Sequence, residues 1–571
     1  NTAGVTLEFS NITVEGIGTD VKIAGRLIYA GNADVILGSN TLIGNSFSQN
    51  IGVGVRCNNL TMNANSMIRH CYVNSTTDGG AGAHISGILK MSDFAAICFN
   101  TNINTYGTSI HGRYAVGGAY VKTLEMSGNS SIYGNFSQTK GSNDASAKGG
   151  AGVYIYGSDD SVISDNASIR DNFSYYQLCS GVYFPSSKLI LADSASVVSN
   201  SVIPHSSRVP YSQALYGSTL IMSNKASVVY NGNKASNATG EKPDGCMQVA
   251  NLFMYDDSLV VSNKSRNFGG VIISAGGGMY DKSKIGFNEG RYTGYKSRNG
   301  GVLVLGGSFS LNDDCVIEGH NGGSSYIISG AGACGSGRLI VNSGTIKNNN
   351  TGVCSGFGAD GGTVEINGGQ IINNATCGIR LGSRVSTYTF SSNGKVEVNG
   401  GLIAYNGAAF AEYTSSLNFT GYFRGGIFAD NTAASSLTRP SYKYMFSGVP
   451  CFEDPIKLLY TNVTFYIDGR MRSGAQIPII FKTLNSKSKE IESLTDANSY
   501  GLDMKQDGSM VPQIVALPSG RITNAARYSK YFSVANEFSD PTVERYMNDA
   551  GEGRMGLSQY RYSGSSLFMV Y

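Results

Sequence analysis

A twelve-residue unit recurs along much of the chain, and it limits the folds that the chain can adopt. The unit runs from Leu124 to Asn135 and recurs at 161–172, 189–200 and 220–231. Apolar residues stand at its positions 1, 3 and 9 and Asn at position 12, except that Ser161 replaces one apolar residue. Three later copies, at 339–349, 364–374 and 396–406, are one residue shorter. Such recurrence is typical of a solenoid, in which each repeat forms one structural turn.

The spacing inside the unit predicts short strands joined by a tight turn. Apolar residues at alternate positions form one face of a strand, and the Gly, Asn and Ser residues between them favour turns. Such a unit has no partner for its inner face until the next coil stacks on it at about 4.8 Å. We therefore predict an all-β, single-stranded parallel β-helix, a solenoid whose insertions, such as Lys140–Lys148 and Asn231–Gly245, leave at one corner. The residues expected to face inward include Leu124, Met126, Ile132, Leu220, Met222, Val228, Val364, Ile366 and Ile371.

Several of these segments resemble a known group of proteins. The unit at Leu124–Asn135, the segment GGAGVYIYG at Gly149–Gly157 and the segment VEINGGQIINN at Val364–Asn374 resemble bacterial surface proteins with a pectin-lyase-like β-helix. Phe-x-x-Asn sequences such as Phe99–Asn102 are also similar to polymorphic outer-membrane adhesins. The resemblance implies a right-handed parallel β-helix and an extracellular, cell-surface location. It does not imply one activity, because this fold hosts adhesins, structural shafts and polysaccharide-degrading enzymes.

The composition changes near residue 450. Charged residues become more frequent from Cys451 onward, and Pro440, Pro450 and Pro455 cluster at the change. We therefore predict two domains, a parallel β-helix over 1–450 and a small β-rich domain over 451–571. The second domain is expected to cap the open end of the solenoid or to mediate assembly, because an open end exposes core residues and unpaired strand edges.

The overall composition excludes several classes of protein. The net charge of +3 on 571 residues gives no reason to expect a nucleic acid as partner. With 41% hydrophobic and 15% charged residues the chain is not disordered. No apolar run approaches the roughly 18 residues of a transmembrane helix. The ten cysteines are too sparse for a disulfide scaffold, so we expect buried free thiols, with disulfides between neighbouring coils as the alternative.

Residues for polysaccharide cleavage are sparse. The best catalytic candidates are Asp159 and Asp160, since paired carboxylates perform glycoside hydrolysis, but the expected companion motifs are absent. The pairs Asp256–Asp257 and Asp313–Asp314 occupy other coils, and we interpret them as solvated turn residues. His70 and His320 are interpreted as turn residues, and His84, His111 and His205 as loop residues. We predict no metal site and no cofactor.

The sequence therefore favours a non-enzymatic extracellular protein, either an adhesin or a structural subunit of a surface layer, filament or sheath. A polysaccharide lyase or glycoside hydrolase is the alternative. The expected partners are other copies of the chain, components of the cell surface, or carbohydrate. For carbohydrate or protein contact the candidate aromatic residues are Tyr175, Tyr176, Tyr211 and Tyr216.

The first strands supply a candidate assembly edge. Val5, Leu7 and Phe9 alternate in one apolar strand, and no capping helix is predicted before them. An uncapped first coil offers unpaired backbone groups to another chain. We therefore expect Val5, Leu7 and Phe9 to contact another subunit or an upstream part of the same precursor, and repeated head-to-tail contacts would build a filament.

Overall fold

The computed structural model describes most of the chain, and its contacts divide it into two compact units, Asn1–Gly332 and Ala333–Tyr571. The described residues are 4–16, 26–48, 53–75, 79–104, 114–139, 149–175, 178–203, 212–232, 245–265, 270–290, 301–320, 330–334, 337–354, 362–381, 393–412, 418–437, 442–458, 465–481, 510–516, 530–534, 543–551 and 554–561. The insertion at Lys140–Lys148 and residues 233–244 of the other expected insertion lie outside them.

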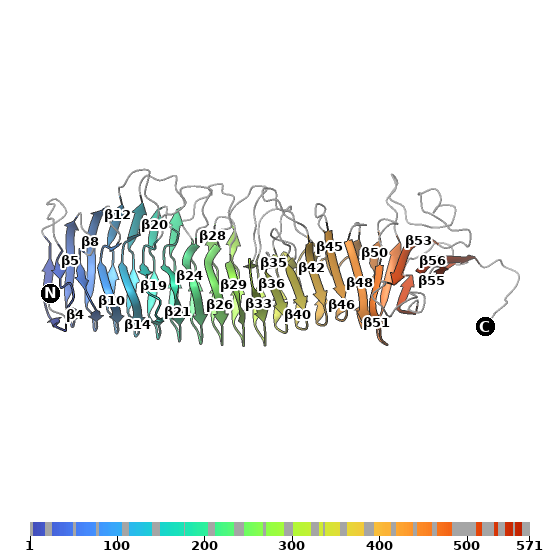
Figure 1. Cartoon of the computed structure of the whole chain (residues 1–571), viewed down its shortest axis with the longest axis horizontal. Helices are drawn as coiled ribbons and strands as arrows, with labels where there is room; N and C mark the ends of the chain where they lie inside the picture. Colours follow the sequence, from blue (N-terminus) through green and yellow to red (C-terminus); the bar gives the residue numbers. More distant parts are fainter. Residues whose placement is uncertain are drawn as a thin grey trace. The chain divides into compact units, whose positions relative to one another are not determined.

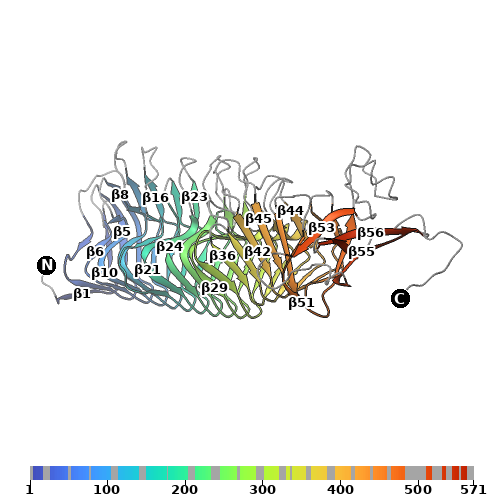
Figure 2. The same ribbon diagram turned by 45° about the vertical axis from the view of Figure 1, so that its right-hand side comes forward.

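The first unit is a parallel β-solenoid whose full coil has four short strands. In one coil these are β17 (Val153–Ile155), β18 (Ser161–Ile163), β19 (Ser168–Arg170) and β20 (Phe173–Tyr175). Equivalent strands of successive coils pair in parallel, as β19 does with β15 before it and β22 after it. The strands of this unit stack in chain order, from β4 through β10, β14 and β21 to β29 (Figures 1 and 2). The predicted parallel β-solenoid is therefore confirmed.

Four rows of strands run through the first unit, numbered here by their order within a coil. Row 1 contains β3 (Ile28–Tyr29), β6 (Val55–Cys57), β17, β32 (Val302–Val304) and the first parts of β10 (Ala83–Met91), β14 (Ala119–Met126), β21 (Val182–Leu191), β24 (Ser212–Met222), β26 (Gly245–Met254) and β29 (Val271–Met279). Row 2 contains the second parts of those six long strands together with β1 (Thr6–Phe9), β4 (Asp34–Leu37), β7 (Leu60–Met62), β18 and β33 (Ser308–Leu311).

Rows 3 and 4 complete each coil. Row 3 contains β2 (Thr13–Glu15), β11 (Ala96–Cys98), β15 (Ser131–Tyr133), β19, β22 (Ser196–Val198), β25 (Ser227–Val229), β27 (Leu259–Val261), β30 (Lys284–Gly286), β34 (Val316–Glu318) and the first parts of β5 (Leu42–Ser48) and β8 (Met67–Ser75). Row 4 contains the second parts of β5 and β8 with β12 (Thr101–Asn104), β16 (Phe136–Thr139), β20 and β23 (Ser201–Ile203). Four two-residue strands, in two parallel pairs, complete the unit: β9 (Gly79–Gly80) with β13 (Ala115–Val116), and β28 (Lys264–Ser265) with β31 (Glu289–Gly290).

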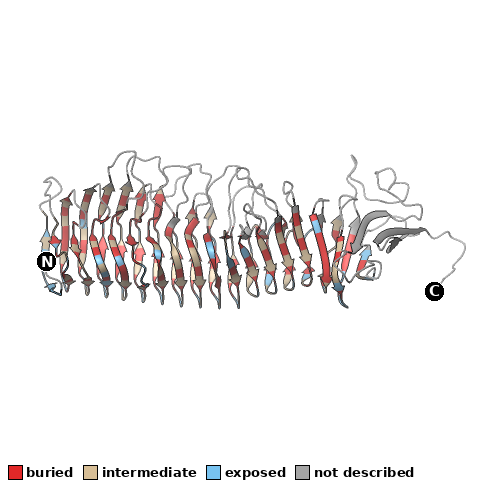
Figure 3. Cartoon of the chain, viewed as in Figure 1, coloured by how far each residue is buried: buried red, intermediate tan, exposed pale blue. Residues whose placement is uncertain are grey.

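The interior of the solenoid consists of stacked apolar side chains. Leu124 stacks on Leu89, and Ile132 lies between Ile97 and Ile169 in the parallel register. All nine residues that the repeat places inside are buried. Buried and partly exposed residues alternate along the strands (Figure 3), as expected when one face of each strand contacts the core.

From Asn100 onward, a ladder of buried asparagines lies between rows 3 and 4. Both the backbone N and the Nδ2 of Asn135 donate to Oδ1 of Asn172, each at 3.0 Å, and Asn172 makes the same pair of bonds to Asn200. In the first unit the ladder contains Asn100, Asn135, Asn172, Asn200, Asn231, Asn263 and Asn288. His320 takes the next position, with Nδ1 3.4 Å from the backbone oxygen of Asn288. The closing Asn of the repeat thus supplies hydrogen bonds from coil to coil.

The residue before each ladder position adopts a left-handed backbone. Its φ lies between 52° at Phe287 and 69° at Gly319 throughout the ladder of the first unit. Where this residue is Phe, the next coil has Gly: a Cβ added to Gly134 would lie 2.6 Å from the Phe99 ring. Glycine is needed there for the space that the aromatic ring occupies, and it also adopts the left-handed φ without strain.

The second unit is also a parallel β-solenoid, but its coils have three described strands or fewer, and its core is more aromatic. Its parallel strands are β35 (Gly330–Cys334, which begins in the first unit), β36 (Arg338–Val341), β37 (Thr345–Lys347), β38 (Thr351–Cys354), β39 (Thr363–Ile366), β40 (Gln370–Ile372), β41 (Cys377–Leu381), β42 (Asn393–Val398), β43 (Leu402–Ala404), β44 (Phe410–Glu412), β45 (Asn418–Phe423), β46 (Ile427–Ala429), β47 (Ser435–Leu437), β48 (Tyr442–Gly448), β49 (Cys451–Phe452), β50 (Ile456–Leu458), β51 (Phe465–Met471), β52 (Ile477–Phe481), β53 (Met510–Ala516) and β54 (Phe532–Val534). Its ladder contains Asn349, Asn374, Asn406 and Asn431 and ends at Asp454, whose Oδ2 accepts from the N and Nδ2 of Asn431.

The coil-to-coil pairing continues past the domain boundary expected at residue 450. β46 pairs in parallel with β49, and β48 with β51, so that Tyr444 stands beside Phe465. Antiparallel pairing begins later, where β56 (Arg554–Arg561) joins β53 and β55 (Val543–Gly551). The change in composition near residue 450 therefore comes before the change from parallel to antiparallel pairing. The added charged residues, such as Arg470 and Arg472, are exposed, while Phe465 continues the apolar core.

Candidate functional site

The two aspartates expected to be the best catalytic candidates form ion pairs with separate coils. Asp159 and Asp160 lie in the turn between β17 and β18. Nζ of Lys122, in the preceding coil, is 3.7 Å from Oδ2 of Asp159, and Nζ of Lys188, in the following coil, is 2.5 Å from Oδ2 of Asp160. The carboxylates are 64% and 52% exposed, so these are surface ion pairs.

The other aspartate pairs lie in the turn between rows 2 and 3, where they support the backbone. Oδ2 of Asp256 accepts from the backbone N of Asn224, and the backbone N of Asp256 donates to Oδ2 of Asp281. Asp281 is bound in the same way to Asp313. These carboxylates form a second ladder. Among the described residues, no group of three or more His, Cys, Asp or Glu side chains could hold a metal ion.

A row of aromatic side chains stands on the outer face of row 1. Tyr120, Tyr154, Tyr183 and Tyr216 occupy equivalent positions in four successive coils. Their ring centroids are 5.0, 4.9 and 5.5 Å apart in that order. Tyr154 and Tyr183 are 5% and 3% exposed, and burial raises the pKa of both phenols. The middle of this row is therefore packed structure rather than a free surface.

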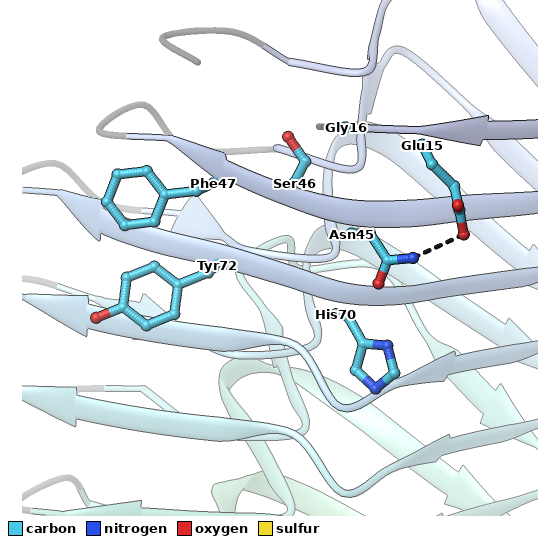
Figure 4. Close-up of a pocket in the computed structure, with 7 residues that line it drawn as sticks. All are labelled: Glu15, Gly16, Asn45, Ser46, Phe47, His70 and Tyr72. Carbon is cyan, nitrogen blue, oxygen red and sulfur yellow. Dashed lines mark hydrogen bonds between the residues drawn. The ribbon is translucent and has the colours of Figure 1, made fainter. Parts of the chain in front are cut away.

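A separate pocket lies where β2, β5 and β8 meet. It has a volume of about 680 Å³ and is lined by Glu15, Gly16, Asn45, Ser46, Phe47, His70 and Tyr72 (Figure 4). The volume is within the range of sites that hold small ligands. Phe47 and Tyr72 are register partners in row 4, and their rings stack with centroids 5.0 Å apart and planes 17° apart.

Polar groups lie beside this aromatic pair. Nδ2 of Asn45 donates to Oε1 of Glu15 at 2.7 Å, the bond drawn in Figure 4. His70 and Asn45 both have a φ of 52°, the left-handed geometry of the corner before row 4. The pocket thus combines aromatic faces with a carboxylate, an amide and an imidazole, which can accept and donate hydrogen bonds to hydroxyl groups.

The aromatic patch expected from the sequence is only partly described. Tyr175 packs edge-on against Phe136 and Phe173 in row 4, whereas Tyr216 belongs to the row 1 stack. Tyr176 and Tyr211 lie outside the described residues. The structure therefore assigns Tyr175 and Tyr216 to different rows of strands. Phe47 and Tyr72 were not predicted, because a single aromatic residue in a short strand carries no signal of its own.

One histidine expected in a loop is in a strand. His84 lies in β10, with its ring stacked on that of Tyr120 at 4.9 Å. The prediction was wrong because His84 precedes the repeat copy that begins at Leu89 and lies in row 1, where it occupies the outward position between the inward Ala83 and Ile85. His111 and His205 lie outside the described residues.

The cysteines whose side chains are described are free thiols. Cys57, Cys71, Cys98, Cys179, Cys246, Cys315 and Cys377 are buried, and Cys451 is partly exposed. Burial raises the pKa of the Cys57 thiol to about 12. Neutral thiols packed in the core are poor nucleophiles, so the seven buried cysteines supply no reactive site.

The expected assembly edge is partly exposed. β1 pairs with β4, which sets Leu7 beside Val35 and Phe9 beside Leu37. Val5 is 43% and Leu7 40% exposed, whereas Phe9 is only partly exposed.

Comparisons with known proteins give no relative: no protein-family model, no curated protein and no solved structure matches the chain. In the described part of the chain, no helix is both long and apolar enough to cross a membrane.

Proposed function

We propose that this chain is a non-enzymatic, extracellular adhesive protein that binds carbohydrate. The observation that carries the proposal is the stacked pair of Phe47 and Tyr72 in a pocket that also presents Glu15, Asn45 and His70. A sugar ring has an apolar face that packs on aromatic rings and hydroxyl groups that need hydrogen-bonding partners. The resemblance to bacterial surface proteins supports the extracellular location.

Binding by the whole chain tests the proposal. Isothermal titration with neutral oligosaccharides, namely lactose, maltotetraose, cellotetraose and chitotetraose, is expected to show saturable binding of at least one. Phe47→Ala and Tyr72→Ala should each weaken that binding by about tenfold or more, since a stacked aromatic contributes on the order of 1 kcal/mol beyond its buried area. Phe94→Ala is the matched control, because Phe94 is 67% exposed in a turn outside the pocket. Equal weakening by Phe94→Ala, or no effect of either pocket variant, contradicts the proposal.

The same samples test the catalytic alternative. We expect no unsaturated products and no new reducing ends from uronate-containing or neutral polysaccharides, with or without calcium. Product formation that is lost in Asp159→Asn or Asp160→Asn would show instead that the chain is a lyase or hydrolase.

A structural role in a filament or sheath is a second proposal, favoured by the exposed side chains of Leu7 on β1 and of Val5 just before it. Sedimentation velocity over a range of concentrations tests it. If the chain self-associates and Leu7→Asp abolishes the association, the result supports an assembly edge at β1. If the chain is a monomer at every concentration, the result contradicts the structural role.

A further inference from the structure

A second outward-facing group lies in the first coils of row 1. Tyr29, Arg56, His84 and Tyr120 occupy one register position in four successive strands, β3, β6, β10 and β14. The inward neighbours in these strands, such as Val55 and Cys57, are buried. The four side chains therefore project from the outer face of the solenoid, one strand spacing of about 4.8 Å apart.

Two guanidinium groups share the Tyr29 ring. Cζ of Arg26 is 4.8 Å and Cζ of Arg56 5.7 Å from the ring centroid. Tyr29 itself is 53% exposed. The ring therefore positions two cations at a surface that solvent reaches, by a cation–π interaction with each.

The positive charges of this group are close enough to affect one another. The pKa of Arg26 is lowered by burial and then by the charge of Arg56. Within the part of the chain that the structure describes, no carboxylate pairs with the Arg56 guanidinium. Asp34, a carboxylate of a nearby strand, accepts hydrogen bonds from Asn58 and Asn59 instead. Since like charges repel, the group would be stabilised by an anion.

His84 adds a neutral imidazole to the same row. Burial, followed by the charges of Arg56 and Arg26, lowers the pKa of His84 to about 4, so the imidazole is neutral near pH 7. Its Nδ1 is buried and has no hydrogen-bond partner among the described residues. The neutral imidazole therefore adds no positive charge to the group, whose two cations are Arg26 and Arg56.

We propose that Arg26, Arg56 and Tyr29 bind a saccharide that carries one oxyanionic group, a sulfate ester or a carboxylate. The anion lies against the two guanidinium groups, which match its oxygens with paired N–H donors. The sugar ring packs against the exposed part of the Tyr29 side chain. This inference rests on the proposed carbohydrate-binding function and adds a separate subsite with a chemical preference.

Three sugars that share one scaffold test the inference: lactose, 3′-sulfolactose and 3′-sialyllactose, each titrated into the whole chain. We expect an anionic sugar to bind at least tenfold more tightly than lactose, and this preference to decrease as salt rises. The two anionic arms show whether the site prefers a sulfate ester or a carboxylate, and a preference for either supports it.

Variants locate the binding site. Arg56→Gln should remove most of the preference for the anionic sugar, and Arg56→Lys should keep only part of it, because an ammonium group lacks the paired donors. Lys225→Gln removes the same charge from an exposed position in another coil and should have no effect. An equal loss in Arg56→Gln and Lys225→Gln, or no preference for either anionic sugar, overturns the inference.

The outcome is distinguishable from failure of the proposed function. If Phe47→Ala weakens lactose binding while Arg56→Gln changes nothing, the pocket stands and this subsite does not exist. If the anionic sugars bind through Arg56 while no neutral sugar binds, the subsite stands and the assignment of the pocket is wrong. If none of these sugars binds, both proposals are wrong.

Discussion

The asparagine ladder provides a quantitative test of what holds neighbouring coils together. Asn172 is fully buried. Its Oδ1 accepts from the backbone N and the Nδ2 of Asn135, both at 3.0 Å, and its Nδ2 donates to Oδ1 of Asn200 and to the backbone oxygen of Ile132, also at 3.0 Å. Asn172→Ala removes all four hydrogen bonds at once.

The expected cost follows from which groups lose their partners. Nδ2 of Asn135 still donates to Ile97, and Oδ1 of Asn200 still accepts from the backbone N of Asn172. The backbone N–H of Asn135 keeps no acceptor, which costs about 1–3 kcal/mol for a buried donor. Three further bonds at about 0.5–1.5 kcal/mol each raise the expected loss to about 2.5–7.5 kcal/mol.

Denaturation and hydrogen exchange measure this loss together. Coils of a solenoid can open locally, so backbone exchange in a peptide that covers Asn135 is the more direct measurement. Exchange there should become roughly 100-fold faster or more, since each 1.4 kcal/mol corresponds to a factor of ten. Asn166→Ala is the control, because Asn166 lies in an exposed turn of the same coil. If Asn172→Ala unfolds at the same denaturant concentration as Asn166→Ala and keeps Asn135 protected, the ladder does not stabilise the fold as argued.

Three further predictions concern single positions. Burial lowers the pKa of His320 to about 4, below its value of about 6.5 in an unfolded chain, so the unfolded state takes up the proton first as the pH falls. Stability should therefore decrease by about 2 kcal/mol between pH 7.5 and pH 5, and His320→Asn, which restores the ladder residue, should remove this part of the pH dependence of urea unfolding. Ile132→Ala should cost about 2–5 kcal/mol in the same assay because Ile132 is fully buried between two coils, and a loss below 1 kcal/mol would contradict its place in the core. Gly134→Ala should lower the free energy of unfolding by about 1 kcal/mol because of the left-handed φ of 63°, and by more because the new Cβ contacts Phe99. The double variant with Phe99→Ala should therefore lose less stability than the sum of the two single variants.

The sequence by itself determined the repeated core of this protein. Leu124, Met126 and Ile132 could be assigned to the interior because the strand period places alternate side chains on one face and every coil repeats the same pattern. The closing Asn could be recognised because it recurs at the same position of each repeat. Its hydrogen bonds could not be predicted, since they join Asn135 to Asn172, residues that become neighbours only when the coils stack.

Only the tertiary structure decided which outward side chains come together. Arg56 and His84 are 84 − 56 = 28 positions apart, whereas His84 and Tyr120 are 120 − 84 = 36 apart, yet all three share one register position. The coils differ in length, so no constant period in the sequence identifies these neighbours. The pairing of Phe47 with Tyr72 and the continuation of the coils past residue 450 were hidden in the same way. Outward-facing positions need not be apolar, so no pattern in the sequence identifies them. Their neighbours are set by how the backbones of successive coils align.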